Sequence, residues 1–217
     1  MGSTIDTLAQ KDTNCIVKKH NTCQREFIQY DQEGNEVYYY RYQNNLFNRF
    51  VIQVYDTYNN EVGQIEKVNG CCEINFTFYD ENRQIIYYIV KHQNCCENTF
   101  TFYNSDNNKE SMIKIKHACC EHTFEEYDKY DSRTNSAIGK PICSGFTYYE
   151  NDIYGSPKFI IKIMNECKRQ FLKIYDSNNM EVNLNNKSII KDGFTRIQIV
   201  IIINLLFEEG NNNNNNH

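Results

Sequence analysis

The sequence predicts a mostly β protein, a closed antiparallel barrel of about 12 strands built from repeated hairpins around a hydrophobic C-terminal helix. Three observations lead to this fold class. A cysteine recurs every 24 residues, aromatic and β-branched residues alternate with polar ones within each repeat, and the last apolar stretch loses that alternation. Alternation with a period of two is typical of strands, and its loss indicates a different element.

The repeat is marked by Cys71, Cys95, Cys119, Cys143 and Cys167, which lie 24 residues apart. Two of the units continue with the same four residues, Phe-Thr-Phe-Tyr, at 76–79 and 100–103. Self-similarity at a fixed period indicates a repeated supersecondary unit.

Each unit is predicted to be a β-hairpin. Phe76 and Phe78 belong to a first alternating segment, Asp80 to Arg83 supply turn residues, and Ile85 to Val90 form a second strand-like segment. Six or seven such hairpins make about 12 to 14 strands, and closing the sheet removes its exposed edges.

The C-terminal stretch, 194–207, is apolar almost all round and is interpreted as a helix, with a buried strand as the alternative. Thr195 and Gln198 are placed as a capping box. As a helix, its apolar part from Ile197 to Phe207 spans about 16 Å, half the hydrocarbon thickness of a bilayer. We expect its residues to serve either as a plug inside the barrel or as a membrane segment: Ile197, Val200, Ile201, Leu205 and Phe207.

The expected domain organisation has three parts. Residues 1–22 form a polar N-terminal segment, 23–209 the barrel with its helix at 194–207, and 210–217 a disordered Asn-rich tail. The N-terminal residues contain no apolar run of signal-peptide type, so we expect a cytosolic chain with reduced thiols.

Composition narrows the function classes. The net charge is −5 and no window is rich in Lys or Arg, which argues against a nucleic-acid partner. Aromatic residues make up 14% of the chain, too many for a disordered protein. No pattern of nucleophile and base indicates catalysis, and we expect no enzyme activity.

Adjacent cysteines are the main candidate site. If every unit is a hairpin, these pairs gather on one rim of the barrel, where S-acylation would tether the protein to a membrane. The alternative is that one thiol of each pair fills the core. The six candidates are Cys71, Cys72, Cys95, Cys96, Cys119 and Cys120. A zinc site that also uses His92, His117 and His122 is a further alternative.

Several segments together resemble the phospholipid scramblase family, which is similar in fold to the tubby C-terminal domain and to the LURP-one-related proteins. They are the Cys-Cys units, Phe50 to Asp56 followed by Asn60-Glu61-Val62, Ala137 to Lys140, and the final Ile-rich stretch that ends at Phe207-Glu208. The resemblance covers the chain from about Cys23 to Glu209.

The resemblance implies ATP-independent movement of phospholipids between leaflets, with calcium as a candidate cofactor, by a protein on the cytoplasmic face of the plasma membrane. The alternative that it implies is a non-transporting, tubby-like module that binds lipids or phosphoinositides. Family members carry an acidic, calcium-binding segment before the terminal helix. The corresponding residues here are Asp176, Glu181, Asn183 and Asp192, which would bind calcium weakly because amides replace carboxylates.

Overall fold

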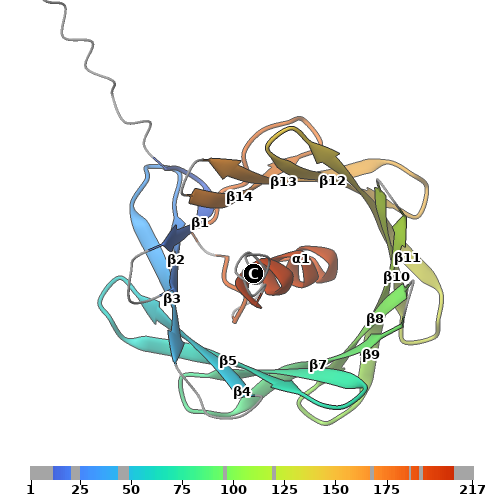
Figure 1. Cartoon of the computed structure of the whole chain (residues 1–217), viewed down its shortest axis with the longest axis horizontal. Helices are drawn as coiled ribbons and strands as arrows, with labels where there is room; N and C mark the ends of the chain where they lie inside the picture. The colour runs from blue at the N-terminus through green and yellow to red at the C-terminus, as the bar shows by residue number, and fades with distance from the viewer. Residues whose placement is uncertain are drawn as a thin grey trace, which may run out of the picture.

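The computed structural model of the chain is a closed antiparallel barrel with a helix inside it (Figure 1). It describes residues 12–20, 25–43, 49–94, 97–118, 121–166, 169–185, 187–190 and 193–207. Each strand from β1 to β14 pairs with its neighbours in sequence, and β1 pairs with β14 to close the ring. The predicted fold class is confirmed, with 14 strands where about 12 were expected.

The first seven strands are β1 (Cys15–His20), β2 (Arg25–Tyr30), β3 (Glu36–Gln43), β4 (Arg49–Asp56), β5 (Glu61–Asn69), β6 (Glu73–Asp80) and β7 (Ile85–Gln93). The second seven are β8 (Glu97–Asn104), β9 (Lys109–Ala118), β10 (Glu121–Asp128), β11 (Arg133–Ile142), β12 (Gly145–Asp152), β13 (Pro157–Glu166) and β14 (Arg169–Asp176). The single helix among the described residues is α1 (Arg196–Phe207). Strand β1 lies in the segment that was expected to precede the barrel, so the barrel begins before residue 23.

Alternation places one set of side chains in the interior and the other on the outside. In β6, Phe76 and Phe78 are buried, at 3% and 0% exposed. On the outer face, Tyr88 of β7 stacks on Tyr103 of β8 with ring centroids 4.9 Å apart. β-branched and aromatic residues favour strands because they pack well on such a pleated, half-buried surface.

Seven turns of one kind form one end of the barrel, which we call the turn rim. They span 31–35, 56–60, 80–84, 104–108, 128–132, 152–156 and 176–180. In the turn that starts at Asp80, the carboxylate accepts the backbone amides of Asn82 and Gln84 at 2.9 and 2.8 Å. The fourth residue, here Arg83, has a positive φ. This is the three-residue hairpin loop with a left-handed last position, for which Asp and Asn are suited.

The other end of the barrel, which we call the cysteine rim, carries the hairpin turns at 70–72 and 143–144. It takes its name from Cys71, Cys72 and Cys143, whose side chains are all exposed. The 24-residue repeat thus places successive unit starts at the same end of the barrel, as predicted.

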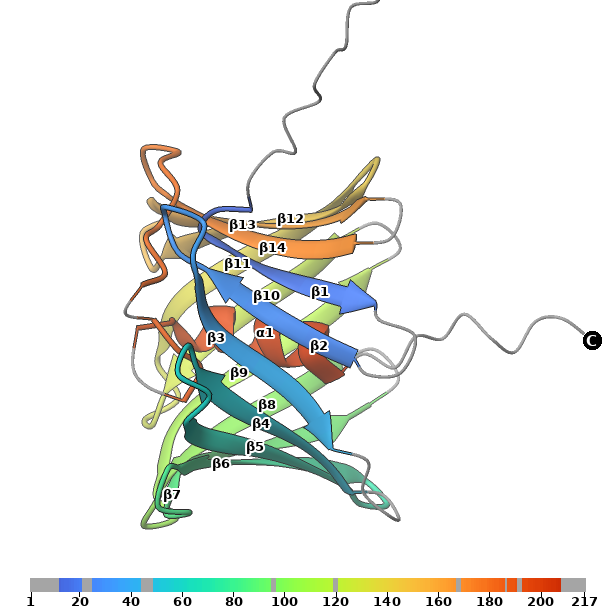
Figure 2. The same cartoon turned by 90° about the vertical axis from the view of Figure 1, so that its left-hand side faces the viewer.

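Helix α1 runs through the barrel interior from the turn rim toward the cysteine rim (Figure 2). The expected capping box is present: the Gln198 amide donates to Thr195 Oγ1, and the Thr195 amide donates to Gln198 Oε1, each at 3.2 Å. Residues on separate faces of the helix, such as Ile197, Ile202 and Ile203, are each 0% exposed. A helix that is apolar on every face requires such complete enclosure.

Candidate functional site

Two of the six candidate cysteines are described, and both lie at the surface. Cys71 and Cys72 are exposed in the turn between β5 and β6, where the Gly70 amide donates to the Glu73 carbonyl at 2.8 Å. Neither thiol fills the core, in contrast with the packing alternative. The remaining candidates, Cys95, Cys96, Cys119 and Cys120, lie outside the described residues.

A shallow hollow of about 410 Å³ lies beside these two thiols. Lys67, Glu73, Ile74 and Gln93 contribute to its lining together with the thiols. The Lys67 ammonium lies 5.1 Å from the ring centre of Phe50 and 5.8 Å from that of Phe207. The arrangement brings two exposed thiols, an ammonium group, a carboxylate and apolar surface together at one place on the rim.

Cys15 provides a contrast with the exposed thiols. It is 1% exposed, and burial raises the pKa of its thiol to about 12. Because the thiolate is the reactive form, a buried cysteine with a raised pKa is inert.

The histidines near the same rim form a pair. The rings of His117 and His122 are 4.7 Å apart in an edge-to-face arrangement, and Asn98 Nδ2 lies 2.8 Å from His117 Nε2. Burial lowers the pKa of both rings, and His122 also lowers that of His117. Within the described part of the chain, no three His, Cys, Asp or Glu side chains gather closely enough to hold a metal ion, so the zinc alternative gains no support there.

The turns at the two ends of the barrel differ in their acidic residues. Six of the seven turns at the turn rim start with an aspartate: Asp31, Asp56, Asp80, Asp128, Asp152 and Asp176. At the cysteine rim, the described turn residues 70–72, 94 and 143–144 include no acidic residue. The strand ends near that rim carry both charges. Basic residues there include Arg49, Lys67, Lys91, Lys140 and Arg169, and acidic residues include Glu73, Glu97 and Glu121.

The calcium candidates are engaged in other contacts. The Asp176 carboxylate accepts the amides of Asn178 and Met180, and Glu181 pairs with Lys173 at 2.6 Å. Asn183 accepts the backbone amide of Asn185, and Asp192 lies outside the described residues. Calcium prefers six to eight oxygen ligands, so the described candidates do not fit such a site.

The candidate helix residues line the barrel interior. Ile197 and Val200 are 0% exposed, Leu205 is 1%, Ile201 is 2% and Phe207 is 8%. Among the described residues, no helix has the length and apolar content needed to cross a bilayer.

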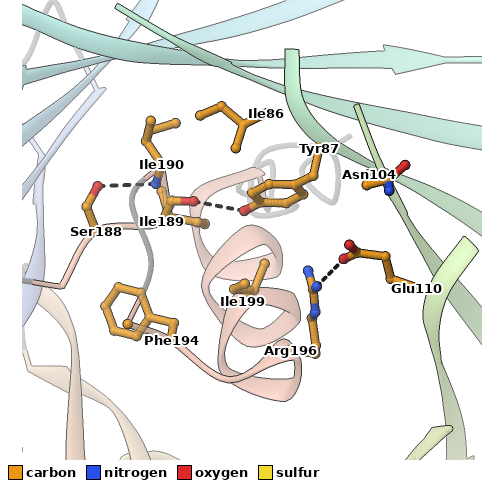
Figure 3. Close-up of a pocket in the computed structure, with 11 residues that line it drawn as sticks. Ile86, Tyr87, Asn104, Glu110, Ser188, Ile189, Ile190, Phe194, Arg196 and Ile199 are labelled. Carbon is orange, nitrogen blue, oxygen red and sulfur yellow. Dashed lines mark hydrogen bonds and ion pairs between the residues drawn. The ribbon is translucent and has the colours of Figure 1, made fainter. Parts of the chain in front are cut away.

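A cavity that the sequence did not predict lies at the start of the helix (Figure 3). It has a volume of about 340 Å³ and lies where Arg196 of α1 pairs with Glu110 of β9. Its other lining residues come from β7, the end of β8, the segment before α1 and α1 itself. They include Ile86, Tyr87, Asn104, Ser188, Phe194 and Ile199. One signal in the sequence marks the place: Asn104 stands where the other six turns have Asp.

In comparisons with known proteins, no family model and no curated protein matches the chain.

Proposed function

We propose that this protein is a membrane-associated, scramblase-like module that binds phospholipid surfaces through its cysteine rim without moving lipids between leaflets. The observation that carries the proposal is the exposure of Cys71 and Cys72 beside Lys67, on a rim whose described turns hold no acidic residue and whose strand ends carry charges of both signs. Acylation of both thiols would give a stable anchor, because each buried methylene contributes about 0.8 kcal/mol. Each cation close to an anionic leaflet adds about 1 kcal/mol.

The enclosed helix favours binding over transport. Its apolar side chains contact the inner face of the barrel, so inserting them into lipid would first require unpacking the core. Transport through a spanning helix would also need about 20 apolar residues, and α1 has 12 residues. ATP-independent lipid movement, which the scramblase resemblance implies, is therefore the competing proposal.

One reconstitution experiment separates the two proposals. The full chain is mixed with phosphatidylcholine vesicles that contain or lack phosphatidylserine and carry a fluorescent lipid in both leaflets. Flotation measures binding, and quenching by dithionite measures leaflet exchange, each with and without calcium. We expect binding that phosphatidylserine strengthens, no exchange above that of protein-free vesicles, and no effect of calcium.

Exchange above protein-free vesicles would overturn the non-transporting module in favour of transport, and absence of binding to either vesicle would contradict both. The tether is tested in cells by hydroxylamine-sensitive thiol exchange. The Cys71→Ser, Cys72→Ser double variant should lose acylation and membrane association, whereas Cys143→Ser, at an exposed thiol of the same rim, serves as the matched control.

A further inference from the structure

We propose that the cavity at the start of α1 binds a small zwitterion, a molecule with a phosphate or carboxylate for Arg196 and an ammonium group for Glu110. The cavity lies at the turn rim, opposite the cysteine rim, so this proposal is independent of lipid binding. The acidic and basic groups that it uses come from different elements, β9 and α1.

The Arg196–Glu110 pair is placed to contact a ligand. Both side chains line the cavity and remain partly open to solvent, with 30% and 38% of their side-chain surface exposed. The guanidinium lies 4.9 Å from the ring centre of Phe102, which fixes its plane on one side. A lone anion would have to displace Glu110 from Arg196, whereas a zwitterion supplies a partner for each charge.

The surroundings favour an anionic group beside Arg196. A second hollow shares Asn104, Glu110 and Arg196 and adds Lys129 and Lys109, of which Lys109 also pairs with Asp131 at 2.6 Å. Asn104 keeps the turn through its Oδ1, which accepts the amides of Asp106 and Asn108 at 3.1 and 2.9 Å, but it brings no negative charge. Aspartate would form the same turn, as it does at the other six positions, and would repel an anion.

The remaining lining sets the size and polarity of the ligand. Ile86, Phe194 and Ile199 supply apolar surface, and the Tyr87 hydroxyl is held by the Ile189 carbonyl at 2.8 Å (Figure 3). A volume of about 340 Å³ lies at the lower end of the range for small-molecule sites. The cavity therefore suits a compact amino-phosphate or amino acid with a short apolar part.

Titration calorimetry on the full chain tests this assignment with three probes: O-phosphoethanolamine, inorganic phosphate and ethanolamine. We expect O-phosphoethanolamine to bind with a Kd of about 1 mM or tighter and at least about tenfold more tightly than either fragment. Equal affinity for the zwitterion and for phosphate, or no binding of the zwitterion, would overturn the proposal.

Variants locate the binding. Glu110→Gln and Asn104→Asp should each weaken O-phosphoethanolamine about tenfold, the first by removing the partner of the ammonium and the second by repelling the phosphate. Asn104→Asp restores the residue found in the other turns, so it should fold normally. Glu61→Gln is the matched control, because Glu61 pairs with Arg83 at 2.8 Å without lining this cavity. Unchanged affinity in both cavity variants would refute the site.

The same headgroup chemistry occurs free in solution and in lipids, so a final arm adds phosphatidylethanolamine vesicles as competitor. The expected result is that vesicles do not reduce binding of the soluble probe; this arm alone rests on the proposed function, in which the cysteine rim faces the bilayer. Competition by vesicles would overturn the assignment of a soluble ligand and place the turn rim against lipid.

Discussion

At the scale of single residues, Glu150 is the most deeply buried of the described carboxyl residues. It is 0% exposed inside the barrel, where Thr195 Oγ1 donates to its Oε2 at 3.1 Å and Gln198 Nε2 approaches the same oxygen at 3.4 Å. Burial raises its pKa from 4.5 to about 7, and the Glu126 carboxylate adds to the effect, while Thr195 and Lys158 oppose it. The N-terminal end of α1 is therefore hydrogen-bonded to a carboxyl group whose pKa lies near neutral pH.

This pKa makes stability depend on pH in a defined direction. The unfolded chain releases the Glu150 proton near pH 4.5 and the folded chain near pH 7, so ionisation favours unfolding. The stabilisation is complete below pH 4.5 and is lost as the pH rises through 7, a change of about 3 kcal/mol in unfolding free energy. Denaturant titrations from pH 4.5 to 8.5 should show this decline in the native chain but not in Glu150→Gln. Parallel profiles for the two proteins would contradict the assignment.

At the scale of elements, the seven turns share one backbone geometry, but they differ in how well the residue at the left-handed position suits it. The position with positive φ holds Gly, Asn or Asp in six turns and Arg83 in the seventh. The left-handed backbone conformation costs about 1–2 kcal/mol for a residue such as arginine, and Asn tolerates it better. The surface ion pair between Arg83 and Glu61 contributes only about 0–1 kcal/mol to the unfolding free energy.

Replacing Arg83 by Asn should therefore raise the unfolding free energy by about 0.5 kcal/mol, since relief of the backbone outweighs the lost ion pair. The reverse change in a turn of the same type, Asn179→Arg, should lower it by about 1 kcal/mol. Urea denaturation of both variants measures the difference. A loss of stability in Arg83→Asn would mean that the ion pair dominates.

The helix illustrates how elements depend on one another. Its β-branched run, Val200 to Ile203, has weak intrinsic preference for helix, and an isolated segment of 12 residues is marginal in water. The capping box defines its start, and the surrounding strands bury the apolar side chains. Tertiary packing therefore stabilises a conformation that propensity alone leaves open between strand and helix.

At the scale of the whole molecule, the sequence predicts what is periodic and local. The 24-residue spacing of Cys71 and its equivalents predicted hairpins whose unit starts share a rim, and the apolar C-terminal run predicted an enclosed helix. Strand β1 was missed because Ile16 and Val17 form a short segment without the cysteine marker of the repeat. The cavity was missed because Arg196 and Glu110 are 86 positions apart and meet only after the barrel closes.

Closure itself depends on β1, the strand that joins the two ends of the sheet. It pairs with β2 over Cys15 to His20 and with β14 over Cys15 to Lys19, and both Ile16 and Val17 are 0% exposed. Deleting residues 1–20 would leave β2 and β14 with unpaired edges, and open edges recruit strands from other chains. We expect this variant to form dimers or larger aggregates by light scattering, and to unfold at lower urea concentration than the native chain.

Deleting only residues 1–11, ahead of the first described residue, should leave both properties unchanged. A monomeric and equally stable product of the longer deletion would show that the barrel closes without β1.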